Sequence, residues 1–236
     1  MCGRYVSPEQ AAIERVWHAG RSGGTPFPRR FNVQPTSLVP VLKWSRTLQA
    51  VQLAQARWGL IPTWWKGEKP PRLTFNARVE EAATKPMWRH CLQRARCLLP
   101  AEGWYEWQEV ERVDPATGEV RKVRQPCFIR LAGGKLFCFA GLMAPWSPPG
   151  KEEPLLTCSI LTRPATAALA AIHPRMPLAL PDDSHAAWLD PTLTQADEAL
   201  ELARAHALSE FEHYPVSARV NKAGNDDPDL IRPLDS

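Results

Sequence analysis

The 236-residue sequence contains no apolar run long enough to cross a bilayer, and its first residues lack the charged and apolar regions of a signal peptide. We therefore expect a protein of the cytoplasm. Internal repeats and low-complexity linkers are also absent, so one domain over residues 1–236 is the simplest interpretation.

The spacings that mark common metal sites are missing as well. None of the six cysteines forms a C-x-x-C pair, which argues against a zinc ribbon or a thioredoxin-like site. The histidines include no H-x-x-x-H pair and no H-E-x-x-H sequence, which argues against a metal hydrolase. We expect free thiols, no metal and no cofactor. Buried packing is the expected role of the cysteines in apolar runs, which are Cys127, Cys138 and Cys158.

Proline, by contrast, is abundant, and its 24 residues favour turns and strand ends over a helical bundle. Apolar runs typical of strands recur with short connections, and two connections resemble hairpin turns, at 114–119 and at Gly133–Gly134. These features predict an α+β fold: a single compact domain with a mostly antiparallel, barrel-like β core and a few peripheral helices. The predicted strand runs are 37–44, 48–61, 97–107, 125–132, 136–144 and 155–162, and two late helices are predicted at 182–189 and 193–208.

The first predicted helix has signals at both ends. Ser7 can cap its N-terminus, Pro8 suits the first helical position, and Gln10 completes a capping box. Gly20 can end it. We therefore predict a helix within residues 7–20.

Positive charge is concentrated in one segment. The whole chain has a formal net charge of +4, whereas residues 61–100 contain eight basic and three acidic residues, a net charge of +5. Two interpretations stay open, a solvated surface and a groove that follows phosphates. The basic residues are Lys66, Lys69, Arg72, Arg78, Lys85, Arg89, Arg94 and Arg96.

Cys2 differs from the other cysteines because it lies in no apolar run. Removal of Met1, which aminopeptidases perform before a small residue, would leave Cys2 with an α-amine and a thiol on adjacent carbons. The α-amine has a pKa of about 7.7–8.0, so part of it is neutral and nucleophilic at physiological pH. Such a group can attack an acyl carbon, or it can condense with an aldehyde to an imine and then a five-membered thiazolidine. An incidental cysteine is the third possibility.

Other polar residues could support such chemistry. In "FNARVE", Asn76 and Arg78 would face the same side of a strand, the amide for a hydroxyl and the guanidinium for a phosphate. Glu106 lies between two aromatic residues, and desolvation there would raise its pKa toward neutrality. Glu102 competes for this role but falls in an expected turn. His173, in "AIHPRMPLAL", is either a structural or a catalytic histidine.

Tryptophan is the most unusual component of the composition. Trp58, Trp104 and Trp107 are expected to fill a core. Trp64 and Trp65 instead lie between prolines and lysines in an expected loop. Aromatic side chains beside cations suit base stacking in single-stranded nucleic acid.

The ordered stretches "MCGRY", "FNVQP", "WGLIP.WW", "NARVE", "RCLLPAEGWYEW", "IHPRMP" and "YPVS..VN" resemble the SRAP family, named for SOS-response-associated peptidase. They extend along nearly the whole chain, and jointly they are specific. Family members include sensors of abasic sites in single-stranded DNA, which they bind covalently through the N-terminal cysteine. The resemblance therefore implies a monomer that binds abasic single-stranded DNA, associated with the nucleoid when bound.

The resemblance also implies roles for individual residues. Cys2 would supply both nucleophiles, Asn76 would position the deoxyribose and the cysteine, and Glu106 would be the acid that opens the sugar ring. His173 would assist the imine chemistry and the reversal of the crosslink. Implied contacts to the DNA backbone are Arg4, Arg78 and Arg175, and implied contacts to flanking bases are Trp64 and Trp65.

Two other functions stay open from the sequence. In the first, Cys2 is released by, or performs, autoproteolysis, with Glu106 and His173 as helpers. In the second, the protein is a noncovalent single-strand binder that uses Trp64, Trp65 and the basic segment.

Overall fold

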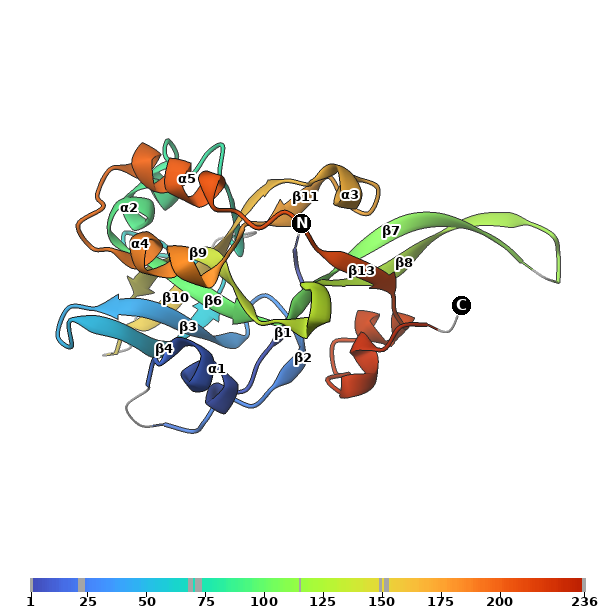
Figure 1. Cartoon of the computed structure of the whole chain (residues 1–236), viewed down its shortest axis with the longest axis horizontal. Helices are drawn as coiled ribbons and strands as arrows, with labels where there is room; N and C mark the ends of the chain where they lie inside the picture. Colours follow the sequence, from blue (N-terminus) through green and yellow to red (C-terminus); the bar gives the residue numbers. More distant parts are fainter. Residues whose placement is uncertain are drawn as a thin grey trace.

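Two β-sheets organise the chain in a computed structural model that describes residues 2–20, 24–67, 70, 74–114, 116–148, 150 and 153–234 (Figure 1). The first sheet has the strand order β13-β8-β7-β1-β2. These strands are β1 Tyr5–Ser7, β2 Arg30–Val33, β7 Gly103–Val113, β8 Val120–Arg130 and β13 Glu212–Pro215. Strands β7 and β8 form a long hairpin whose outer half projects from the rest of the molecule (Figure 1).

The second sheet curves into a partial, barrel-like ring. Its order is β11-β10-β4-β3-β6-β9-β12, and β9 pairs with β10 as well as with β6. Among the described strands, β10 runs parallel to β4 and to β5, and the other pairs are antiparallel. The strands are β3 Leu38–Ser45, β4 Ala50–Trp58, β5 Asn76–Arg78, β6 Arg96–Ala101, β9 Phe137–Trp146, β10 Leu155–Pro164, β11 Arg175–Pro177 and β12 Ala179–Leu180.

Short helices lie around this core. Helices α2, α4 and α5 pack on one another and on β6 and β9 (Figure 1). None of the helices in the described part of the chain is long and apolar enough to cross a membrane. The helices are α1 Gln10–Trp17, α2 Pro86–Arg94, α3 Ala167–Ala170, α4 His185–Leu189 and α5 Ala196–Ala205, with 3-10 turns η1 Ala132–Gly134, η2 Asp182–Ser184, η3 Ala218–Asn221 and η4 Pro228–Ile231. The α+β fold with a barrel-like β core is thereby confirmed.

The apolar core is divided between the two faces of the ring. One cluster lies under α2, α4 and α5, and a second, which contains Cys2, Trp58 and Trp104, lies between the ring and the first sheet. Trp58 and Trp104 are fully buried, as expected, whereas Trp107 is half-buried and donates its indole N–H to Asn221. Cys127, Cys138 and Cys158 are buried, which confirms their expected packing role.

The ends of the first helix were predicted incorrectly. Ser7 is the last residue of β1 and pairs with Arg30, so its backbone is committed to a sheet and cannot cap a helix. The helix begins at Gln10, and Glu9 before it makes no side-chain cap. His18, in the left-handed region with φ 49°, ends the helix two residues before Gly20.

Two other sequence predictions concern places where the chain passes from one sheet to the other, and the second of them fails. The strand-like run 97–107 is divided at Glu102, which lies in the expected turn, and its two parts belong to different sheets, β6 to the ring and β7 to the first sheet. The expected turn at Gly133–Gly134 lies in η1, which leads from β8 in the first sheet to β9 in the ring, so no hairpin forms there. The turn at 114–119 is confirmed by the β7–β8 hairpin.

Candidate active site

The four predicted catalytic residues come from distant segments that the two sheets bring together. Cys2 leads into β1, which pairs with β7 at Tyr5 and Trp104. Asn76 begins β5, opposite Ile160 of β10. The amide Nδ2 of Asn76 donates a hydrogen bond of 2.8 Å to the carbonyl oxygen of Cys2, so these two residues are in direct contact.

Because side chains alternate between the two faces of a strand, Glu106 of β7 points toward the side on which Cys2 lies. Trp104 and Glu106 point to one face of the strand, and Trp104 packs in the same apolar cluster as Cys2. Tyr105 points to the opposite face, into a separate cluster. Glu106 is only 3% exposed, and desolvation by this burial raises its pKa to about 7. The carboxyl can therefore hold and release a proton near neutral pH.

The thiol of Cys2 is completely enclosed in the chain that carries Met1. Its exposed fraction is 0%, and burial, together with the nearby charge of Glu106, raises its pKa well above the ordinary value. The expectation of an accessible amine and thiol concerns the chain without Met1, which itself lies outside the described residues. That expectation stays a prediction.

His173 lies just before β11, and its ring is held by the backbone. Its Nδ1 lies 3.0 Å from both the backbone N–H and the carbonyl oxygen of Arg175, so it can accept a hydrogen bond from the first or donate one to the second. Partial burial lowers the pKa of His173, which favours the neutral imidazole. The charge of Glu106 acts on the thiol of Cys2, and the charge of Arg124 acts on both Glu106 and His173, so these groups lie near one another.

The three arginines predicted to contact DNA differ in how strongly other groups of the protein bind their guanidinium groups. Arg78 is exposed and lies 4.0 Å from Glu81. Arg4 donates hydrogen bonds of 2.8 Å to Asn32 Oδ1 and to the carbonyl of Val220. Arg175 binds a carboxylate with both of its terminal nitrogens. Arg78 is thus the most available of the three for a phosphate.

The loop that carries Trp64 and Trp65 exposes an aromatic side chain, as the sequence predicts. Trp64 is 55% exposed, and its ring lies 6.2 Å from that of Trp65 at an interplanar angle of 58°. Trp146 donates its indole N–H to the carbonyl of Trp65, which anchors the loop on β9. An exposed, anchored aromatic side chain can stack on a base at little cost in entropy.

The basic segment 61–100 is not one surface. Arg96 is buried, and its guanidinium donates to the carbonyls of Trp188, Leu92 and Asp190, so it supports the packing of α2 and α4. Lys69 and Arg72 lie outside the described residues. The interpretation of the segment as a continuous phosphate-binding groove therefore loses Arg96, whose burial the alternation of neighbouring apolar residues could have indicated.

Arg124 is a charged residue near the site that the sequence analysis missed. It lies on β8 opposite Glu109, and its positive charge lowers the pKa of both Glu106 and His173. No local signal marks it, because its position depends on the register of the β7–β8 hairpin.

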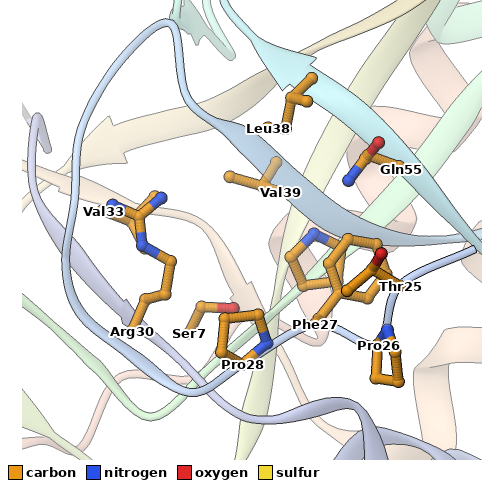
Figure 2. Close-up of a pocket in the computed structure, with 11 residues that line it drawn as sticks. Ser7, Thr25, Pro26, Phe27, Pro28, Arg30, Val33, Leu38, Val39 and Gln55 are labelled. Atoms are coloured by element: carbon orange, nitrogen blue, oxygen red, sulfur yellow. The ribbon is translucent and has the colours of Figure 1, made fainter.

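One cavity of the protein lies away from the predicted site. A cavity of about 360 Å³ lies between β2, β3 and the segment 24–28, and none of the predicted site residues lines it (Figure 2). Its wall is mostly apolar, with Ser7, Arg30 and Gln55 at its edge. Within the described ranges, no group of three or more histidine, cysteine or acidic residues could hold a metal ion.

Comparisons with known proteins concern the chain as a whole. A family model described as SOS response associated peptidase (SRAP) matches residues 1–223. Abasic site processing protein YoqW of Bacillus subtilis (strain 168) is 39% identical over 180 residues, 76% of this chain and 76% of the relative. Abasic site processing protein HMCES of Gallus gallus is 31% identical over 229 residues, 87% of this chain and 66% of the relative. A solved structure from Bacteroides thetaiotaomicron, at 22% identity, has a TM-score of 0.78 and covers 99% of this chain and 100% of its own, which shows a shared fold.

Proposed function

This chain belongs to the SOS response associated peptidase (SRAP) family, and on that premise we propose that it processes abasic sites in single-stranded DNA. Its product is a covalent thiazolidine between the open-chain deoxyribose and Cys2, formed after Met1 is removed. The proposal rests above all on one observation: the carboxyl of Glu106, with a pKa raised to about 7, is buried in the cluster that contains Cys2.

The reaction follows from the chemistry of these groups. Glu106 donates a proton to the ring oxygen of the abasic sugar while the C1 hydroxyl loses its proton to water, and the C1–O bond of the ring breaks to give an aldehyde and a free hydroxyl. The neutral α-amine of Cys2 adds to the aldehyde carbon, and loss of water gives an imine. The thiol then adds across the C=N bond, its sulfur to carbon and its proton to nitrogen, and closes the five-membered ring. Trapping C1 in this ring prevents strand cleavage by β-elimination.

Asn76 and His173 have supporting roles in the proposal. Asn76 fixes the backbone of Cys2 through the 2.8 Å bond to its carbonyl oxygen, while its own Oδ1 is buried without a hydrogen-bond partner. That oxygen is available to accept from the α-amine or from a sugar hydroxyl. His173 assists the proton transfers of imine formation and reversal.

The proposal also assigns contacts to the DNA beside the lesion. Arg78 binds a backbone phosphate, and Trp64 and Trp65 contact bases beside the lesion. Arg4 and Arg175 remain predicted phosphate contacts, although internal partners hold both guanidinium groups in the free protein. The protein acts as a monomer of the cytoplasm, associated with the nucleoid when bound.

A denaturing gel tests the proposal. The protein is incubated with a uracil-containing single-stranded oligonucleotide pretreated with uracil glycosylase, and a heat-stable crosslinked band is expected. Cys2→Ala should lose this band and retain an imine that borohydride can trap. Cys91→Ala, which removes a buried thiol from the other core cluster, is the matched control and should crosslink normally. Undiminished heat-stable crosslinking by Cys2→Ala refutes the assignment.

The same samples separate the two other functions. Equal affinity for intact and abasic oligonucleotides without a covalent product would indicate a noncovalent binder. An intact mass that retains Met1 in Glu106→Ala but not in the unmodified sequence would indicate autoproteolysis.

A further inference from the structure

An ion pair between Glu80 and Arg175 joins two of the strands that carry the candidate active site. Glu80 lies in the turn after β5, which begins with Asn76, and Arg175 is the first residue of β11. The guanidinium of Arg175 donates from Nη1 to Oε1 of Glu80 over 2.6 Å and from Nη2 to Oε2 over 3.0 Å. This two-point geometry fixes the orientation of both side chains.

The guanidinium crosses the strand between them. Nη2 of Arg175 also donates to the carbonyl oxygen of Thr162 over 2.7 Å and approaches its Oγ1 at 3.3 Å. Thr162, on β10, pairs with Arg78 of β5 on one edge and with Pro177 of β11 on the other. The side chain of Arg175 is 16% exposed, so its charge is committed to this junction.

The backbone of Arg175 contacts the ring of His173. The backbone N–H and the carbonyl oxygen of Arg175, the residue that the ion pair anchors, both lie 3.0 Å from Nδ1 of His173. A shift of Arg175 would therefore weaken the contact that holds this ring. Hydrogen bonds from Arg175 hold the pKa of Glu80 below its ordinary value, so Glu80 is an anion throughout the neutral range.

We propose that Glu80 is a positioning residue for the abasic-site reaction: through its two-point contact with Arg175, it holds the backbone that orients the ring of His173. The inference rests on the proposed function and adds a residue to it. Glu80 touches neither the sugar nor Cys2 in this role, and Arg175 acts as a clamp between strands. A base or acid oriented by a third group is a recurrent arrangement in catalysis.

The chain offers a matched control one residue away. Glu81 belongs to the same turn, forms an ion pair with Lys85 at 2.7 Å and lies 4.0 Å from Arg78. Both contacts are solvent-screened, and neither reaches β10 or β11. Glu81→Gln therefore removes the same charge from the same turn without releasing Arg175.

The first test measures single-turnover crosslinking to an abasic oligonucleotide as a function of DNA concentration. Glu80→Gln should lower the rate constant at saturating DNA by about ten- to a hundredfold, because misorientation of a group near the chemistry has effects of this size. The DNA concentration at half saturation should not change, and Glu81→Gln should match the unmodified protein. An unchanged rate constant, or tighter binding because Arg175 is freed for a phosphate, would overturn the inference.

The second test does not depend on DNA chemistry. Protein labelled with ¹⁵N-histidine is used, with the His173 ring signals assigned from a His173→Asn variant. Glu80→Gln should shift the Nδ1 signal of His173, because the backbone of Arg175 that contacts Nδ1 is released, and Glu81→Gln should not shift it. If the unmodified protein forms no crosslink, the proposed function fails and this spectrum alone decides the inference. Identical His173 signals in Glu80→Gln and in the unmodified protein contradict it.

Discussion

The β7–β8 hairpin has an inner half that is built into the molecule and an outer half that projects from it (Figure 1). Glu106 lies on the inner half, 3% exposed, and Glu109 lies three residues farther along the same strand on the outer half. Desolvation raises the pKa of Glu106 to about 7, whereas a hydrogen bond from Lys122 lowers the pKa of Glu109.

The comparison shows how the surroundings of a glutamate change the pKa of its carboxyl. The two carboxyls share a strand and a partner strand, but they are three residues apart and therefore point to opposite faces of β7. The inner one faces a cluster assembled from β1, β5 and the segment before β11, and loses its water there. The outer one stays solvated and is an anion at neutral pH. Reactivity on this strand therefore depends on both the half and the face of the hairpin on which a carboxyl lies.

The largest expected difference between the halves is in crosslinking. Glu106→Gln should lower the rate constant for crosslinking to abasic single-stranded DNA by about a hundredfold or more, since it removes a general acid. Glu109→Gln should leave the rate constant unchanged. Time courses on denaturing gels measure both, and equal rates for the two variants would remove Glu106 from the mechanism.

Substitutions in the inner half of the hairpin should lower the free energy of unfolding more than substitutions in the outer half. Trp104 is fully buried on the inner half, and Trp104→Ala should lower the free energy of unfolding by about 3–5 kcal/mol. Val120, at 57% exposure near the tip, should change it by less than about 0.5 kcal/mol when replaced by alanine. Urea unfolding followed by tryptophan fluorescence gives the comparison for Val120→Ala, and circular dichroism gives it for Trp104→Ala. Similar losses would mean that the outer half is also part of the core.

The raised pKa of Glu106 should make stability depend on pH. The folded protein holds this proton up to about pH 7, whereas an unfolded glutamate loses it near pH 4.3, so the stabilisation is complete below about 4.3 and is lost as the pH rises to about 7. Relative to Glu106→Gln, the unmodified protein should therefore lose about 3 kcal/mol over that range. Denaturant titrations at several pH values test this, and parallel curves for the two proteins would show an ordinary pKa.

The smallest effect is expected from the outer ion pair. Glu109 and Lys122 lie 2.8 Å apart with side chains 63% and 67% exposed, so water and salt screen their attraction. Lys122→Ala should not change the unfolding midpoint or the crosslinking rate measurably. A clear loss of DNA affinity in Lys122→Ala would instead assign the outer half to DNA binding.

Much of this architecture could be predicted from the sequence because it is local. Alternating apolar residues marked the long strands, and the turn at 114–119 marked the hairpin. The resemblance to the SRAP family, based on ordered motifs from "MCGRY" onward, is confirmed by the family match. Helix α2 could have been found from Pro86 at its first position and the buried spacing of Trp88, Cys91 and Leu92.

What could not be predicted depends on pairing between distant segments. A turn at Glu102 was expected, but the local sequence does not show that the chain passes to another sheet there, nor that η1 at Gly133 connects two sheets. The contact of Asn76 with Cys2 requires the placement of β1 against β7 and of β5 against β10. The internal partners of Arg4 and Arg175 likewise come from residues far along the chain.

Peptide mass spectrometry of the crosslinked protein tests the central claim most directly. Trypsin cleaves after Arg4, and digestion of the DNA leaves the sugar remnant on the peptide that carries it. The account predicts a peptide that begins at Cys2, ends at Arg4 and carries the deoxyribose as a cyclic adduct. A crosslinked protein that retains Met1, or an adduct on a lysine elsewhere in the chain, would contradict the account.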